Sequence, residues 1–127
     1  MSLSDSKISP AVGVSDIGKA KGFYEGKLGL TGGGETGDGG VDYQCGGGTS
    51  LHVYPSPGAK PSGATVAAWE VDDVAATVDE LIGNGVTFEQ YDEGPLKTDE
   101  KGIITQDGSK IAFVKDPDGN VLGIAQA

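Results

Sequence analysis

Apolar and polar residues along the chain alternate between strand-like and helix-like spacing. Residues 8–14 form a short β-like run, and Pro10 within it favours a place at the edge of a sheet. Asp16 then offers a helix cap, and apolar residues recur at roughly helical spacing as far as Leu28. Three strands are expected to follow this helix, near 30–36, 41–45 and 49–54. The first part of the chain therefore predicts a β-α-β-β-β unit.

The same order of elements returns after a proline-rich linker at 55–63. A strand is expected at 65–71, and Asp73 caps a helix that ends at the glycine and asparagine residues 83–85. Four more strands are expected, near 86–91, 102–106, 110–115 and 120–126. The first and the last two of these complete a second unit, with 92–107 as a loop inserted into it. A tight hairpin at 116–120, with Pro117 and Gly119 in turn positions, joins the final pair.

The two units can be aligned residue by residue. Residues 14–17 match 71–74 at an offset of 57, and residues 51–54 match 122–125 at an offset of 71. Such short units bury too little surface alone, so they should pack together or across a dimer. The sequence predicts an α+β protein with a disordered N-terminus at 1–7, a first module at 8–54, a linker at 55–63 and a second module at 64–127.

These motifs resemble the vicinal oxygen chelate superfamily, which includes glyoxalase I, bleomycin-resistance proteins, fosfomycin-resistance enzymes and extradiol dioxygenases. The resemblance spans 8–126 and is carried by Val14-Ser15-Asp16-Ile17, Phe23-Tyr24, Leu28-Gly29-Leu30, Val71-Asp72-Asp73-Val74 and Phe113 through Asn120. It implies paired βαβββ modules that form a curled mixed sheet, with the helices on the convex side and a ligand on the concave side. It also implies a homodimer.

Metal-dependent members of this superfamily carry one ligand near the start of the first strand of each module and one in its last strand. The corresponding positions here are Ser9, His52, Val66 and Gly123. A divalent site usually needs at least three protein donors, and valine and glycine offer no side-chain donor. We therefore expect no metal site, no cofactor and no metal-dependent glyoxalase I activity.

The charge balance disfavours some classes of binding partner. The chain has 19 acidic residues against nine basic ones, for a formal net charge of −10, and every basic residue is lysine. This field repels nucleic acid and anionic membranes, and the chain lacks the guanidinium groups that recognise phosphate in two-point contacts. A neutral or cationic small ligand fits it better. The single cysteine, Cys45, forms no internal disulfide, and the N-terminus carries no apolar stretch of signal-peptide or membrane length, so a cytoplasmic location is expected.

His52 is the only histidine, and strand alternation places it on the same face as Ser50 and Tyr54. It is either a half-buried strand residue satisfied by a hydroxyl or water, or a hydrogen-bonding group or general base of a pocket. Glu70 shares a strand face with Val66 and is either a solvated rim residue or an acceptor for the ligand. The ligand-binding candidates are Ser9, Ser50, Tyr54, Val66 and Gly123, and the catalytic candidates are His52 and Glu70.

Three other features suggest no site of their own. Trp69 alternates to the face opposite Glu70 and should pack beneath a helix, and Cys45 has no nearby basic residue that would activate its thiol. Residues 32–37 match GxGxxG, but a hairpin and not a helix should follow them, which excludes a dinucleotide site.

Three functions remain open at the level of the sequence. The first is a metal-independent protein that binds a small molecule without transforming it. The second is a divergent isomerase or lyase that uses His52 with Glu70 or Tyr54 as acid and base. The third is a module that binds another protein and holds no small ligand.

Overall fold

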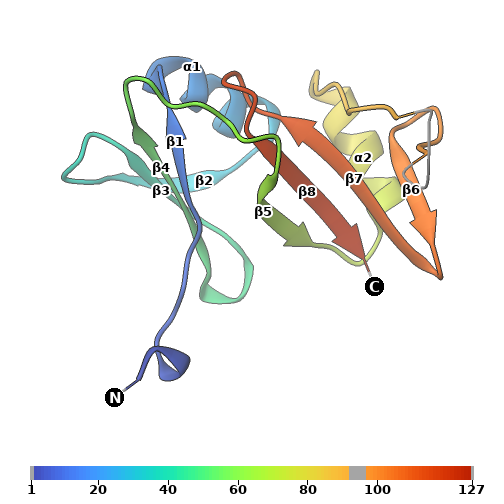
Figure 1. Cartoon of the computed structure of the whole chain (residues 1–127), viewed down its shortest axis with the longest axis horizontal. Coiled ribbons are helices and arrows are strands. Elements are labelled where there is room, and N and C mark those ends of the chain that lie inside the picture. The colour runs from blue at the N-terminus through green and yellow to red at the C-terminus, as the bar shows by residue number, and fades with distance from the viewer. Residues whose placement is uncertain (1, 92–96, 127) are drawn as a thin grey trace.

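A computed structural model describes residues 2–91 and 97–126 of the chain. Its first half forms a four-stranded sheet in the order β1-β4-β3-β2, in which β1 runs parallel to β4 and the other neighbours are antiparallel (Figure 1). The elements of this half are η1 Leu3–Asp5, β1 Ala11–Val14, α1 Ile17–Lys21, η2 Gly22–Lys27, β2 Thr31–Glu35, β3 Val41–Gln44, η3 Gly46–Gly48 and β4 Ser50–Pro55. The predicted place of the strand around Pro10 at a sheet edge is confirmed, because β1 is an edge strand.

The second half repeats the arrangement in a second sheet, ordered β5-β8-β7-β6. Its elements are β5 Thr65–Glu70, α2 Val74–Gly83, β6 Ile103–Gln106, β7 Ser109–Lys115 and β8 Val121–Gln126. Again the first strand lies at an edge and runs parallel to the last one. The predicted α+β class, with two modules built on mixed sheets, is therefore confirmed.

The pairing registers reproduce the offsets read from the sequence. Ala11 lies opposite His52 in the first sheet, and Ala68 lies opposite Gly123 in the second, so β1 maps onto β5 at an offset of 57 and β4 onto β8 at 71. The ladder from β7 to β8 also follows that from β3 to β4. The repeat is thus conserved between modules at the level of individual backbone pairs.

One predicted strand is wrong. Residues 86–91 form no strand, and their one ladder contact is an isolated bridge from Phe88 to Val114. The alternation that suggested a strand is real, because Val86 and Phe88 are both buried, but it reflects packing against β7 without a continuous ladder. The strand expected near 102–106 is present as β6, and among the described residues it is the first strand after α2, in the place that 86–91 was expected to take in the second module. Residues 92–96 of the predicted inserted loop 92–107 lie outside the described residues.

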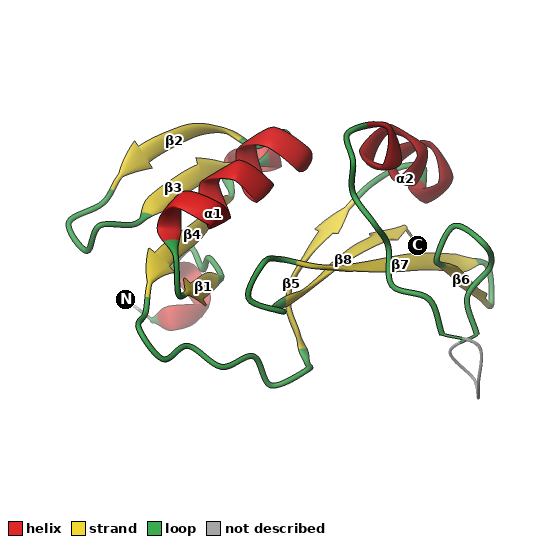
Figure 2. Ribbon diagram, turned by 90° about the horizontal axis from the view of Figure 1, so that it is seen from above, coloured by secondary structure: helices red, strands yellow, loops and turns green. Residues whose placement is uncertain are grey.

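Each helix packs against one face of its own sheet (Figure 2). In the first module the helical segment continues beyond α1 as the π-helical η2, and Tyr24 of η2 stacks on Tyr43 of β3 with ring centroids 6.0 Å apart. In the second module α2 buries Val78 and Leu81, and Trp69 is partly buried against the core. No helix within 2–91 and 97–126 is long and apolar enough to cross a membrane.

The hairpin at 116–120 joins the two modules. Asp116 is buried, and its Oδ2 accepts hydrogen bonds from the Tyr24 hydroxyl and the Asn120 side-chain amide, both at 2.8 Å. The same amide also donates to a carbonyl oxygen of β1 at 3.0 Å. Asp118 accepts from the backbone and hydroxyl of Ser15 at 2.9 and 2.6 Å. Figure 1 shows this turn beside α1, and its contacts hold the first module against the second within one chain.

Candidate functional site

The face of β4 that points away from the helix carries the chemistry of the first module. Leu51 and Val53 are buried in the core, whereas the alternate residues Ser50, His52 and Tyr54 are half-buried. This burial pattern agrees with the alternation expected from the sequence. Among the candidate residues, the structure brings His52 and Tyr54 together: their rings stack with centroids 5.6 Å apart and an interplanar angle of 13°.

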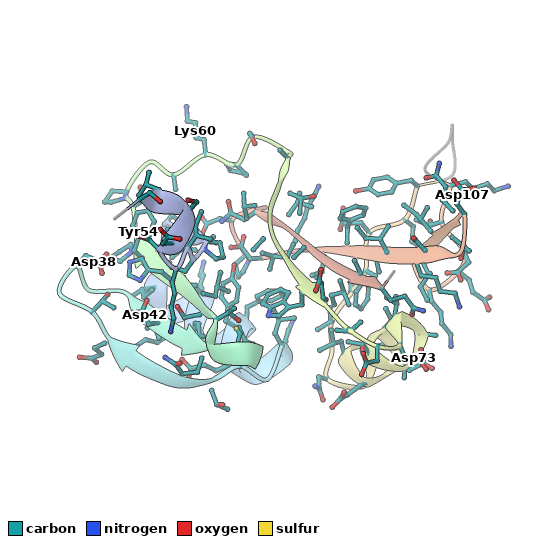
Figure 3. All side chains as sticks on the ribbon, turned by 90° about the horizontal axis from the view of Figure 1, so that it is seen from below. Asp38, Asp42, Tyr54, Lys60, Asp73 and Asp107 are labelled. Carbon is teal, nitrogen blue, oxygen red and sulfur yellow. The ribbon has the colours of Figure 1, made fainter. Side chains whose placement is uncertain are left out.

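His52 is held between two carboxylates. Its Nδ1 lies 2.7 Å from Oδ1 of Asp42, the residue directly opposite it on β3. Its Nε2 lies 2.9 Å from Oδ2 of Asp38, in the turn between β2 and β3. The His52 side chain is 22% exposed and the two carboxylates are 47% and 46% exposed, so both acids remain open to a ligand. Figure 3 shows Asp38, Asp42 and Tyr54 gathered on the first module.

The hairpin backbone fixes Asp38 beside His52. Oδ1 of Asp38 accepts hydrogen bonds from the hydroxyl of Thr36 and, at 2.9 Å, from the backbone N–H of Gly40. Gly40 lies so close to β4 that a Cβ added to it would clash with the carbonyl oxygen of Val53. A side chain at position 40 would push the turn away from β4, so this glycine is needed for the contact between Asp38 and His52.

These contacts shift the pKa values of both partners. The hydrogen bond from Thr36, followed by those from His52 and the Gly40 backbone, lowers the pKa of Asp38 to about 2. The hydrogen bond to Asp38 raises the pKa of His52, against an opposing effect of burial, and Asp42 raises it further. His52 is therefore more protonated near neutral pH than a free histidine. In that state both ring nitrogens donate protons, and neither has a lone pair for a metal ion or an incoming proton.

Tyr54 extends this cluster with a flat aromatic surface. A Cβ added to Gly13 on the neighbouring strand would lie 3.3 Å from the Tyr54 hydroxyl, so the phenol ring rests over the backbone of β1 where no side chain intervenes. The aromatic pair and the two carboxylates together offer an apolar face next to negative charge. Such a surface suits an organic ligand that carries a positive charge or hydrogen-bond donors.

The equivalent face of the second module is apolar. Gly123 occupies the position of His52, and Phe113 occupies that of Asp42. A Cβ on Gly123 would meet Ala68 at 3.4 Å, and Tyr91 packs edge-on against Phe113 at 6.4 Å. The same pair of strands therefore presents charge in one module and hydrocarbon in the other.

The four positions that correspond to metal ligands do not fit a metal. Ser9 is exposed in the segment before β1, and Val66 and Gly123 carry no side-chain donor. His52 uses both of its ring nitrogens on carboxylates. Within 2–91 and 97–126, no group of three or more His, Cys, Asp or Glu side chains is arranged to hold a metal ion.

The remaining candidates are more scattered than the sequence suggested. Glu70 is exposed at the end of β5 and makes no hydrogen bond or ion pair with His52, so the proposed acid–base pair is not assembled in the structure. Ser50 lines a small pocket of about 180 Å³ together with Ala68 and Cys45. Sequence reasoning missed Asp38 and Asp42, although the alternation of β3 already places Asp42 on the outer face.

A protein with two modules of the order β-α-β-β-β, each built on a mixed four-stranded sheet, belongs to a defined structural class. The chain is a member of the Glyoxalase/Bleomycin resistance protein/Dioxygenase superfamily, whose family model matches residues 8–124. The resemblance inferred from the sequence is therefore confirmed.

Several solved structures are similar to this chain. TnmS3, an antibiotic-binding protein from Streptomyces sp. CB03234, is 29% identical with a TM-score of 0.66, over 93% of this chain and 92% of its own. An integron cassette protein from the Halifax Harbour sewage outfall metagenome is 16% identical with a TM-score of 0.71, over 96% and 98% of the two chains. The fosfomycin-resistance protein FosX from Listeria monocytogenes is 9% identical with a TM-score of 0.69, over 96% and 93%. No curated protein matches the sequence.

Proposed function

We propose that this protein is a metal-independent binding protein that holds a neutral or cationic small organic molecule without transforming it. The observation that carries the proposal is the double engagement of His52 by Asp38 and Asp42. A histidine in this state is unsuited to metal binding, and its raised pKa makes it a poor base near neutral pH. What remains is a recognition surface.

The chemistry of that surface supports a cationic or hydrogen-bonding ligand. One imidazolium between two carboxylates leaves a net negative charge at the site, in a chain whose formal charge is already −10. Tyr54 adds a ring on which an aromatic or methylated group can pack. The similarity to TnmS3, an antibiotic-binding protein, supports the binding of a small organic molecule.

The competing proposal is an isomerase or lyase in which His52 works with Tyr54 or Glu70. The stacked rings of His52 and Tyr54 favour the first of these pairs over the second. However, the carboxylates that hold His52 also oppose loss of its proton. Binding without turnover therefore accounts for the geometry better.

Thermal denaturation with added ligands tests the proposal, because a compound that binds only the native state raises the melting temperature. The panel should contain bleomycin as a cationic antibiotic, fosfomycin as an anionic one, and the ions Ni²⁺, Zn²⁺, Mn²⁺ and Fe²⁺. We expect stabilisation by bleomycin but not by fosfomycin or the metal ions, recovery of the compound unchanged after incubation, and much less than one metal per chain by elemental analysis.

A matched pair of variants locates the ligand. Asp42→Asn removes one carboxylate from the cluster, and Asp107→Asn removes the same charge from the turn between β6 and β7, at the opposite end of the molecule (Figure 3). We expect binding to weaken by about five- to tenfold in the first and to be unchanged in the second. Equal losses in both variants, near-stoichiometric metal, or chemical conversion of a bound compound that stops in His52→Ala would each contradict the proposal. Sedimentation of the same samples tests the homodimer that family resemblance suggests.

A further inference from the structure

A second pocket lies on the helix side of the molecule, away from the carboxylate cluster. It has a volume of about 280 Å³ and extends between the end of η2 in the first module and α2 with β5 in the second. Its walls are mainly apolar and include Leu28, Leu30, Trp69, Leu81 and Ile124. The residues of the proposed site, Asp38, Asp42, His52 and Tyr54, do not line this pocket. The pocket is therefore separate from that site.

Backbone features of both modules shape this pocket. Gly29 has a φ of +75°, which turns the chain sharply after η2 and places the neighbouring leucines on its wall. On the other side, the side-chain amide of Asn84, just after α2, donates to the carbonyl oxygen of Lys27 at 3.3 Å. This hydrogen bond ties the two helical ends together beside the pocket. The pocket is therefore formed by the packing of the two modules and not by a single loop.

The charged residues that line the pocket are both acidic. Glu70 at the end of β5 and Glu80 on α2 both line it and are exposed, and no lysine is among its lining residues. The ring of Trp69 provides the aromatic surface that attracts cations most strongly. Carboxylates beside an indole ring in an apolar pocket are the features with which proteins recognise organic ammonium groups.

We propose that this pocket binds a small organic cation, held by Trp69 and by the carboxylate of Glu80, with Glu70 adding negative charge at its rim. The volume lies just below the range of about 300–1,000 Å³ found for drug-sized ligands, so the ligand is a compact one such as a quaternary ammonium. The proposal is independent of the function of the His52 site. It gives the protein a second ligand position in the seam between its modules.

Trp69 supplies a direct readout, because it is the only tryptophan in the chain. Its fluorescence is titrated with choline and, in parallel, with 3,3-dimethylbutan-1-ol, which has the same shape without the charge. We expect a saturable change with choline and affinity at least about tenfold weaker for the uncharged compound. Choline should also bind more weakly in high salt, since the two glutamates are exposed.

Two variants separate the pocket from the general negative field. Glu80→Gln should weaken choline binding about two- to fivefold. Asp107→Asn carries the same charge change at a distant turn, where its φ of 51° is one that asparagine tolerates, and should leave the affinity unchanged. Circular dichroism is used to check that both variants are folded.

Three results would overturn the proposal. They are the absence of a saturable response, equal affinity for the uncharged compound, and a response insensitive to Glu80→Gln. The last would assign the signal to the smaller pocket beside Cys45, which Trp69 also lines. Repeating the titration in Asp42→Asn distinguishes this proposal from that for the His52 site, because choline affinity at the seam should be unaffected there.

Discussion

The hydroxyl of Tyr24 offers a clean test of how the two modules are held together. Tyr24 is fully buried, and its hydroxyl donates to Asp116, which is 5% exposed, at 2.8 Å. Burial, with the negative charge of Asp116, raises the pKa of this hydroxyl far above its usual value, so it remains a donor at all ordinary pH values. Tyr24→Phe removes the hydrogen bond and keeps the ring contacts with Tyr43 and Phe23.

The expected loss follows from what Asp116 retains. A hydrogen bond to a charged group contributes about 1.5–3 kcal/mol. Oδ2 of Asp116 keeps the Asn120 amide at 2.8 Å, and Oδ1 keeps two backbone donors at 2.9 Å, so the carboxylate is not left unpaired. We therefore expect a loss in the lower half of that range, about 1.5–2 kcal/mol, and a melting temperature lower by roughly 5–8 °C for a chain of this size.

Urea denaturation followed by Trp69 fluorescence and by far-ultraviolet circular dichroism measures this loss. The fluorescence reports the second module, whereas the dichroism reports both. Tyr54→Phe is the control, because the Tyr54 hydroxyl makes no hydrogen bond to any residue within 2–91 and 97–126. A loss below about 0.5 kcal/mol in Tyr24→Phe, or one equal to the control, would refute the role of the hairpin contacts in joining the modules.

Three further predictions concern the first site and the second helix. Gly40→Ala should destabilise the protein by about 1–3 kcal/mol in urea denaturation, since the added methyl group meets a backbone oxygen of β4. The pKa of His52, measured by NMR, should exceed about 6.5 and should fall in Asp38→Asn. The stability that the protein gains from this contact is present below about pH 6.5 and is lost as the pH rises through the folded-state pKa. The opposite sign holds for Asp38, whose contribution is present above its unfolded pKa of 3.8 and is lost as the pH falls toward about 2. Asp73→Ala should cost about 0.5–2 kcal/mol by removing the N-cap of α2, whereas Asp72→Ala should change little.

The repeat was the most predictable part of the fold because it rests on local chemistry. Asp16 and Asp73 each accept a hydrogen bond from the backbone N–H three residues later, as helix caps do. Their positions relative to the following strands fix which residues pair. The offsets of 57 and 71 residues between the two modules are therefore also found between their paired strand residues. The turn at 116–120 was also predicted, but its role in joining the modules depends on Tyr24, which is 92 residues away from Asp116 in sequence.

The strand predicted at 86–91 failed for a physical reason. Alternating burial reports which side chains face the core, and Val86 and Phe88 do face it. It does not report whether the backbone pairs with a neighbouring strand. Within 86–91 the only bridge is that from Phe88 to Val114, beside a hydrogen bond from the Glu89 N–H to the Phe113 carbonyl oxygen at 2.9 Å. Whether a backbone segment joins a ladder depends on residues distant in sequence, which a local pattern does not contain.

The His52 cluster was half predictable. The face of His52 followed from strand alternation, whereas the lack of a side-chain metal donor at Val66 and Gly123 followed from the resemblance to metal-dependent members of the superfamily. The carboxylate partner of His52 was not predicted. Strand alternation singled out Glu70, whereas the residue directly opposite His52 in the ladder is Asp42. Once a hairpin joining β3 and β4 is assumed, counting back from its turn pairs residue 42 with residue 52, and that count was available from the sequence.

The two modules show how one backbone can carry different chemistry. Their ladders share the same register, so exchanging His52 and Asp42 for Gly123 and Phe113 alters no backbone pair. It converts a charged, hydrogen-bonding face into an apolar one. Under the function proposed above, we expect a ligand on the first face to be selected by charge and donors, and any group that meets the second face to be selected by shape and apolar area. Placing a histidine at Gly123 alone would not restore symmetry, because Phe113 offers no carboxylate to hold its ring.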